Sequence, residues 1–212
     1  MRDSDLAERI CLLAKSLFDR GLTCGASGNI SARTSDGGLL VTPTGSSMGF
    51  LDPARLARFD EDGRHVGGDQ PTKEMPLHKA FYATREAGAV VHLHSTHSVA
   101  LSMLPDVDAD DMLPPLTPYS VMRLGAVKLL PYIRPGDPKM GDAVRDLDGA
   151  HAAVVLANHG PVVSAGTLED AVYAMEELEE TAKLALLTRG LGPRGLTEEQ
   201  VAELREVFGE PK

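Results

Sequence analysis

The sequence predicts an α/β fold in which helices pack on a mixed β-sheet. Short apolar segments typical of buried strands alternate irregularly with longer segments whose apolar residues recur at helical spacing. The 212 residues, 42% hydrophobic and 25% charged, have the composition of a globular protein with a substantial core. Because no internal repeat or Gly/Ser-rich linker interrupts the chain, we expect residues 1–212 to form a single domain.

The expected helices combine helical spacing of apolar residues with start or stop signals. The first has apolar residues at positions 6, 10, 13 and 17, before the stop signal Gly21. Thr72 is expected to cap a helix that ends before Gly88, with Pro76 tolerated in its first turn. Thr167 begins the longest helix, which continues to about residue 185. Further helices are expected from residue 53, from 97, at 142–147 and from 197.

The expected strands are short. Residues 25–49 contain six glycines, many hydroxyl residues and two apolar pieces, near Ile30 and at 39–41, a pattern typical of hairpin-like strands joined by turns. The remaining expected strands are residues 89–94, 126–130 and 152–157.

Composition and charge exclude several classes of partner. The formal net charge of −10 argues against nucleic acid or an anionic membrane surface, both of which need a basic footprint. No apolar run approaches the roughly 20 residues that span a bilayer, and the N-terminus lacks the apolar stretch of a signal peptide. Two cysteines fit a reducing compartment. We therefore expect a cytoplasmic protein that acts on a small molecule.

Two histidines in the strand expected at 89–94 form the first candidate site. Side chains two apart in a strand share a face, so His92 and His94 point the same way while Val91 and Leu93 point into the core. Paired imidazoles repel when both are protonated and are costly when buried without partners, and a divalent metal resolves both problems. For this pair alone, two structural histidines with satisfied hydrogen bonds are an equally good alternative.

A third histidine, His159, follows the strand expected at 152–157. Histidines at two strand ends can provide three ligands and leave metal positions open for a substrate. Of the others, His97 is expected to begin a helix and His65 to lie in a polar turn. We expect structural or surface roles for the remaining histidines, His65, His78, His97 and His151.

Glu74 is the best candidate for an acid/base group. It lies at an expected helix start, after a polar turn at 67–71. A carboxylate near three histidines and a metal can transfer a proton or act as a fourth ligand. The alternative is a glutamate that only stabilises the helix dipole.

Two glycine-containing turns, Ser27-Gly28-Asn29 and residues 42–47, offer backbone N–H groups and hydroxyls that could hold a phosphate. Neither matches a P-loop or dinucleotide fingerprint, so each alone is also typical of an ordinary turn. The glutamate run at 176–180 is expected to be the solvated face of the longest helix.

Taken together, these residues resemble the class II aldolase/adducin family over about residues 6–187. The motifs that carry the resemblance are Ser27-Gly28-Asn29-Ile30-Ser31, Thr42-Pro43-Thr44-Gly45, Glu74, His92-Leu93-His94 and Asn158-His159-Gly160. Five motifs in this order are far more specific than any one of them. The resemblance implies an α/β/α arrangement around a mainly antiparallel sheet, flanked by helices and assembled as a homotetramer with sites at subunit interfaces.

The resemblance also implies a role for each site residue. The residues implied to bind zinc, or another divalent ion such as Mn²⁺ or Co²⁺, are His92, His94 and His159. Glu74 would accept a proton and ligate the metal when substrate is absent. The residues implied to hold the phosphorylated substrate are Gly28, Asn29, Thr44 and Gly45, adjoined by Thr72 and Lys73. Tyr119 would reach the active site of a neighbouring subunit as a catalytic residue.

Within the family, several segments are similar to enzymes that decarboxylate 3-oxo-tetronate 4-phosphate. These segments are residues 71–74, 91–96, 117–123, 131–137 and 175–182. They imply a metal-dependent carbon–carbon lyase that forms dihydroxyacetone phosphate and CO₂ through an enediolate whose charge the metal stabilises. Lys73 replaces the small hydroxyl residue of fuculose-phosphate aldolases and could bind the substrate carboxylate.

Two alternatives remain open. A sugar-phosphate aldolase of the fuculose-phosphate type would form the same enediolate from a different substrate. A non-catalytic adducin-like interaction domain would have lost the metal ligands, whereas all three histidines and Glu74 are present here.

Overall fold

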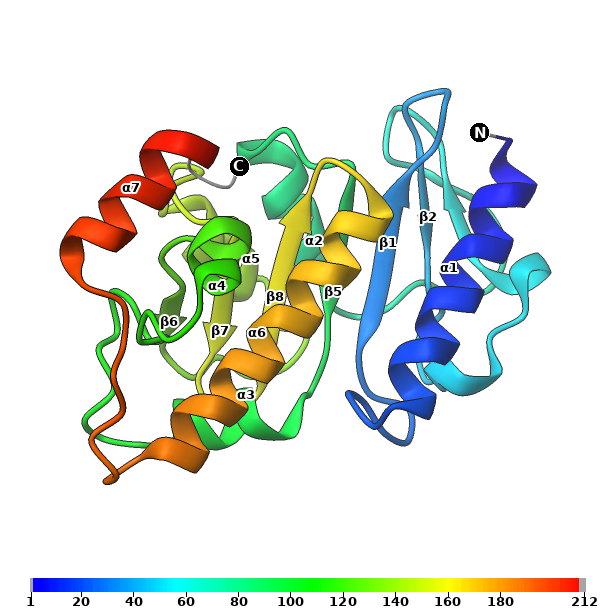
Figure 1. Cartoon of the computed structure of the whole chain (residues 1–212). Coiled ribbons are helices and arrows are strands. Elements are labelled where there is room, and N and C mark those ends of the chain that lie inside the picture. The colour runs from blue at the N-terminus through cyan, green and yellow to red at the C-terminus, as the bar shows by residue number, and fades with distance from the viewer. Residues whose placement is uncertain (1, 210–212) are drawn as a thin grey trace.

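An eight-stranded mixed sheet forms the centre of the protein, which a computed structural model describes for residues 2–209 (Figure 1). The strand order is β4-β3-β2-β1-β5-β8-β7-β6, and every neighbouring pair is antiparallel except β6 and β7. The strands are β1 (Asn29–Arg33), β2 (Leu39–Val41), β3 (Ala57–Phe59), β4 (His65–Gly67), β5 (Ala89–His92), β6 (Lys128–Leu130), β7 (Ala153–Leu156) and β8 (Gly160–Ala165). The predicted α/β class with a mainly antiparallel mixed sheet is confirmed.

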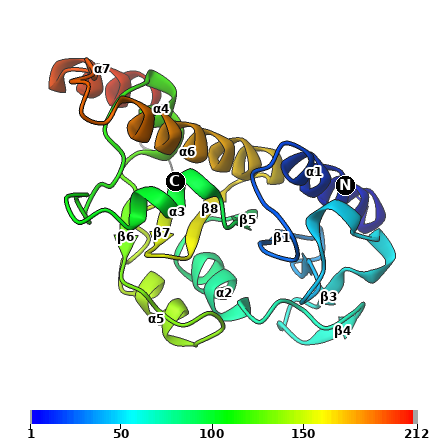
Figure 2. The same ribbon diagram turned by 90° about the horizontal axis from the view of Figure 1, so that it is seen from below.

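Helices cover both faces of this sheet, with α1 and α6 on one side and α2 and α5 on the other (Figure 2). The helices are α1 (Asp3–Asp19), α2 (Met75–Thr84), α3 (Thr96–Ser102), α4 (Pro118–Leu124), α5 (Lys139–Arg145), α6 (Leu168–Thr188) and α7 (Glu198–Phe208), with single 3₁₀ turns at η1 (Met48–Phe50) and η2 (Pro53–Arg55). None of the helices between residues 2 and 209 has the length and apolar character needed to cross a membrane.

The central strand β5 places the His92 side chain on the face of the sheet that α2 covers. Val91 and Leu93 belong to the core under α1 and α6, as predicted, whereas Val90 packs with α2 and α5. Because side chains alternate along a strand, His92 shares the face of Val90. This face is the one covered by α2, whose N-cap residue is Glu74.

Several boundaries differ from the sequence-based expectation. Thr72 does not cap α2, because the helix begins at Met75 and the Thr72 hydroxyl instead accepts a hydrogen bond from the Glu74 N–H at 3.2 Å. Pro76 lies in the first turn of α2, as expected. His65 was wrongly placed in a turn, because it begins the edge strand β4, which pairs with β3.

Candidate metal centre

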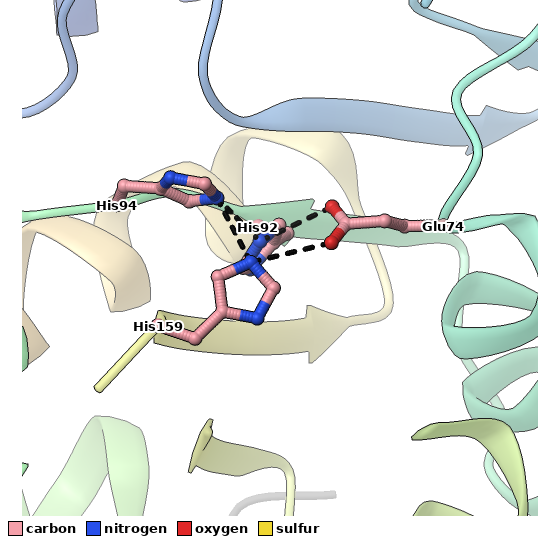
Figure 3. Close-up of side chains that lie close together, drawn as sticks. All are labelled: Glu74, His92, His94 and His159. Atoms are coloured by element: carbon pink, nitrogen blue, oxygen red, sulfur yellow. Dashed lines mark hydrogen bonds and ion pairs between the residues drawn. The ribbon is translucent and has the colours of Figure 1, made fainter. Parts of the chain in front are cut away.

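Three imidazoles and one carboxylate converge beside the carboxyl end of β5 (Figure 3). Their potential ligand atoms all lie within 4.8 Å of one another. His94 Nε2 is 3.2 Å from His92 Nε2 and 3.0 Å from His159 Nε2. Glu74 approaches from the other side, with Oε2 3.2 Å from His92 Nε2 and Oε1 3.3 Å from His159 Nε2. These are the four residues that the sequence assigned to the metal, and their role as ligands remains a prediction.

Two glycines allow neighbouring segments to pack closely against the histidine segment of β5. Gly160 follows His159 at the start of β8, and a Cβ atom there would lie 2.1 Å from the Leu93 carbonyl oxygen. Gly28 has a φ of +82°, and a Cβ atom there would lie 2.9 Å from the His92 carbonyl oxygen. Only glycine fits both contacts without strain, so packing alone requires glycine at these two positions.

Helix α3 begins two residues after His94 and is anchored by a buried carboxylate. Glu179 of α6 accepts hydrogen bonds from the backbone N–H groups of His97 and Ser98, at 2.8 and 2.9 Å, and from the Ser98 hydroxyl at 2.5 Å. The expectation that residues 176–180 form a solvated face is therefore wrong for Glu179, which is only 8% exposed. Its carboxylate satisfies N–H groups that the first turn of a helix leaves without partners.

The same helix connects the two loops that carry histidines. Its last residue, Ser102, accepts a hydrogen bond from the Asn158 N–H at 3.0 Å. Asn158 immediately precedes His159 in the β7–β8 hairpin and adopts a φ of +59°. His94 and His159 are therefore held by the two ends of one short helix.

Hydrogen bonding and burial keep His92 neutral with its Nε2 lone pair facing the cluster. Its Nδ1–H donates to the Pro161 carbonyl oxygen at 2.8 Å. Burial lowers the pKa of His92 to about 4, although the charge of Glu74 opposes this shift. Burial also lowers the pKa of His94. At neutral pH both rings thus present basic nitrogens rather than positive charge.

Glu74 is ionised in this setting. Burial acts to raise its pKa, but His92, the hydrogen bonds from His159 and Asn29, and the charge of His159 outweigh burial and hold the pKa well below its usual range. Lone pairs of the neutral His92 and His94 imidazoles therefore face an ionised carboxylate in a largely buried space, an arrangement that a cation would stabilise. This donor set fits a divalent metal such as zinc, which takes nitrogen and oxygen ligands.

The cluster opens onto a cavity of about 180 Å³ that collects the predicted substrate-binding residues. Its lining contains Gly28, Asn29, Thr44, Gly45, Thr72 and Lys73, together with Glu74 and His94. Pro135 and Gly136 complete the wall, with the Cβ atom of Lys73 3.5 Å from the Cβ position of Gly136. The two glycine-containing turns, far apart from Lys73 in the sequence, thus face the same space as the candidate metal ligands.

Comparison with known proteins decides the family. Residues 8–186 match the model of the class II aldolase and adducin N-terminal domain. The chain belongs to the class II aldolase and adducin family. It is 47% identical to the 3-oxo-tetronate 4-phosphate decarboxylase of Escherichia coli K12 over 96% of both chains. It is 35% identical to the L-fuculose phosphate aldolase of Methanocaldococcus jannaschii, over 82% of this chain and 92% of the relative.

A solved structure has the same architecture as this chain. YgbL from Escherichia coli, described as a putative aldolase/epimerase/decarboxylase, superimposes with a TM-score of 0.93 at 46% identity, over 96% of this chain and 99% of that one. The family resemblance inferred from the five motifs is confirmed.

Tyr119 is the one predicted class II aldolase site residue that the structure places elsewhere. It lies on α4, is 58% exposed and lines a separate hollow with Arg123 and Tyr173. The Tyr119 of this chain therefore does not line the cavity beside its own histidines. Its contribution to the site of a neighbouring subunit remains a prediction.

His78 was expected to have a structural or surface role. In the structure it is fully buried and hydrogen bonded to Asn29 and Ser31, in agreement with a structural role, but its position beside the cluster was not predicted. Two sequence signals point to it. Glu74 and His78 are four residues apart at the start of a helix, and Asn29 and Ser31 are two apart in a strand, so each pair shares a face.

The buried state of His78 predicts a pH-dependent stability. Burial, then the charge of His92, lowers its pKa from 6.5 to about 3, against the opposing effect of Glu74. Below pH 6.5 the unfolded chain therefore binds a proton that the folded chain rejects, so the contribution to stability is present above 6.5 and is lost toward about 3. The free energy of unfolding should fall by up to about 1.4 kcal/mol per pH unit from this group.

Urea unfolding of the metal-free protein and of the variant His78→Gln across this pH range tests the expectation. The stability of the wild type relative to the variant should decrease steadily as the pH falls. Parallel pH dependences of the two proteins would contradict it.

Proposed function

We propose that the chain catalyses the metal-dependent decarboxylation of 3-oxo-tetronate 4-phosphate to dihydroxyacetone phosphate and CO₂. The observation that carries the proposal is a cluster of three imidazole nitrogens and an ionised Glu74. Two members of this cluster, His94 and Glu74, line a cavity together with both glycine-containing turns and Lys73. The 47% identity to 3-oxo-tetronate 4-phosphate decarboxylases over 96% of the chain supports this substrate over an aldol substrate.

The substrate has an anionic group at each end, and the cavity offers partners for both. The phosphate is assigned to the turns at Gly28 and Thr44-Gly45 and to Thr72, whose N–H groups and hydroxyls suit phosphate oxygens. The carboxylate is assigned to the ammonium group of Lys73. The local site is thereby suited to an anionic ligand even though the chain as a whole carries a net charge of −10.

His92, His94 and His159 would hold Zn²⁺, or Mn²⁺ or Co²⁺, with Glu74 as a further ligand in the absence of substrate. When bound, this ion supplies a Lewis acid at the ketone oxygen, where negative charge develops. The protein residues fix the position of that charge, because α3 and the two glycine contacts hold the histidine loops.

In the reaction, the bond between the carboxylate carbon and C2 breaks, and its electron pair moves toward the ketone oxygen to give an enediolate. Formation of dihydroxyacetone phosphate then requires one proton at C2. Glu74 is ionised, so it has to accept a proton before it can deliver one to this carbon. Tyr119 of a neighbouring subunit is the other candidate donor.

The quaternary structure and location belong to the same proposal. Tyr119 is exposed and lies outside its own cavity, as a residue that serves another subunit would. We accordingly propose a cytoplasmic homotetramer with sites at its subunit interfaces, in which residues 1–212 form one catalytic domain.

A coupled assay tests the activity directly. Purified protein loaded with Zn²⁺ is incubated with each C2 epimer of 3-oxo-tetronate 4-phosphate, and dihydroxyacetone phosphate and CO₂ are measured. We expect equimolar formation of both products from one epimer, abolished by a chelator and restored by the metal. Efficient cleavage of L-fuculose 1-phosphate, with neither tetronate epimer consumed, would instead assign the chain to the aldolases.

A further inference from the structure

We propose that His78 is a positioning residue that fixes the Asn29 side-chain amide and, through it, the Glu74 carboxylate at the metal site. This inference rests on the proposed function for the chemistry of Glu74. It extends that function by assigning a role to a second, largely buried layer of polar residues between α2 and β1.

These residues form a continuous chain of hydrogen bonds. The Asn29 Nδ2 lies 2.7 Å from Glu74 Oε2, and its Oδ1 is in hydrogen-bond contact with His78 Nε2. On the far side of the ring, His78 Nδ1 lies 2.7 Å from Ser31 Oγ, which lies 2.9 Å from the Tyr82 hydroxyl. Three side chains, those of Asn29, His78 and Ser31, thus connect the partly buried Tyr82 to the carboxylate of Glu74.

The donor and the acceptor in each of these hydrogen bonds follow from the bond between Asn29 and Glu74. The Glu74 carboxylate only accepts, so the amide nitrogen of Asn29 faces it and the amide oxygen faces His78. That oxygen also only accepts, so His78 must carry its proton on Nε2. Burial keeps the ring neutral, which leaves Nδ1 as an acceptor for the Ser31 hydroxyl. Ser31 in turn accepts from Tyr82.

The opposite tautomer of His78 would not support the site. With the proton on Nδ1, the Nε2 lone pair would face the Asn29 oxygen, and the amide would rotate to relieve the repulsion. Rotation would place the Asn29 oxygen against Glu74 Oε2 and remove the bond that orients this carboxylate. Because Ser31 and His78 are fully buried, water is not available to replace the partners that they would lose.

The geometry explains why the effect reaches the metal. Asn29 holds Oε2 of Glu74, while Oε1 faces His159 at 3.3 Å. A carboxylate held in this way presents a defined oxygen to the ion and to the substrate. Loss of such outer partners typically lowers metal affinity or activity by about 10- to 100-fold.

Two variants of similar size separate the two faces of the imidazole. In His78→Gln the terminal amide reaches the position of Nε2 and can donate to Asn29. In His78→Asn the shorter amide reaches the position of Nδ1 and cannot. We expect His78→Gln to retain Zn²⁺ affinity and kcat within a few-fold, and His78→Asn to lose about 10-fold or more in both, with KM little changed.

Zn²⁺ affinity is measured by competition with a chromogenic chelator, and thermal unfolding reports folding. The matched control is His151→Asn. His151 lies before β7, at the opposite end of that strand from His159, and its ring is hydrogen bonded to the Ala126 carbonyl oxygen. This control should behave as the wild type. Should His78→Asn fail to fold, Ser31→Ala leaves the ring in place and is expected to weaken Zn²⁺ binding several-fold.

The outcomes distinguish this inference from the proposed function. Equal Zn²⁺ affinity and kcat in folded His78→Gln and His78→Asn would overturn the positioning role, as would unchanged Zn²⁺ affinity in Ser31→Ala. If the wild type binds Zn²⁺ but does not decarboxylate 3-oxo-tetronate 4-phosphate, the proposed function fails, while the Zn²⁺ affinities still decide the role of His78.

Discussion

The variant His94→Ala is expected to lose metal binding and turnover together. His94 Nε2 lies within 3.2 Å of the corresponding nitrogens of both other histidines, so its removal opens the centre of the cluster. The loss should exceed the 10- to 100-fold typical of an outer partner, because a direct ligand is removed. His94 is only partly buried and follows the end of β5, so its truncation leaves the core intact.

Metal content after dialysis, Zn²⁺ affinity and kcat are compared for His94→Ala, the wild type and His65→Ala. His65 is an exposed histidine on the edge strand β4, and its variant should match the wild type in all three measurements. A His94→Ala protein with a full complement of zinc and normal activity would remove His94 from the site.

Apolar spacing and capping residues correctly predicted the helices whose formation depends mainly on their own sequence. Helix α1 has evenly spaced apolar residues, and α6 begins with the Thr167 cap that was predicted. The three-residue strands β3 and β4 carry no such signal. Arg58 and His65 are polar, and these strands exist because their backbones pair with β2 and with each other. Strand β8 was missed because Pro161, its second residue, is typical of a turn or an edge.

The parts of the candidate site that could be predicted are those that depend on residues close together in the sequence. Alternation along the strand expected at 89–94 was enough to place His92 and His94 together, although β5 itself ends at His92, and strand ends indicated His159. The positions of Asn29 and Glu179 depend on tertiary contacts instead. Antiparallel pairing sets Asn29 opposite His92, and Glu179 is buried because its partner is the N-terminus of another helix. The residue pattern within a single strand or helix cannot show either contact.

The variant Glu74→Gln is expected to keep the fold and to remain loaded with metal at saturating Zn²⁺, but to lose most of the turnover. The side-chain amide has nearly the same shape as the carboxylate, and its oxygen can still accept the hydrogen bond from Asn29. Three imidazoles remain to hold the ion. The amide cannot accept and deliver a proton, so kcat should fall by about 10²- to 10⁴-fold, the usual contribution of a general acid or base.

The measurement combines kcat and KM for 3-oxo-tetronate 4-phosphate with zinc content and thermal unfolding. Glu86→Gln, which changes an exposed glutamate just after α2, is the matched control and should retain wild-type kinetics. A kcat that falls while zinc content is unchanged identifies Glu74 as the proton-transfer group. If Glu74→Gln decarboxylates at the wild-type rate, Glu74 has no proton-transfer role, and its buried charge serves only the start of α2 and the binding of the ion.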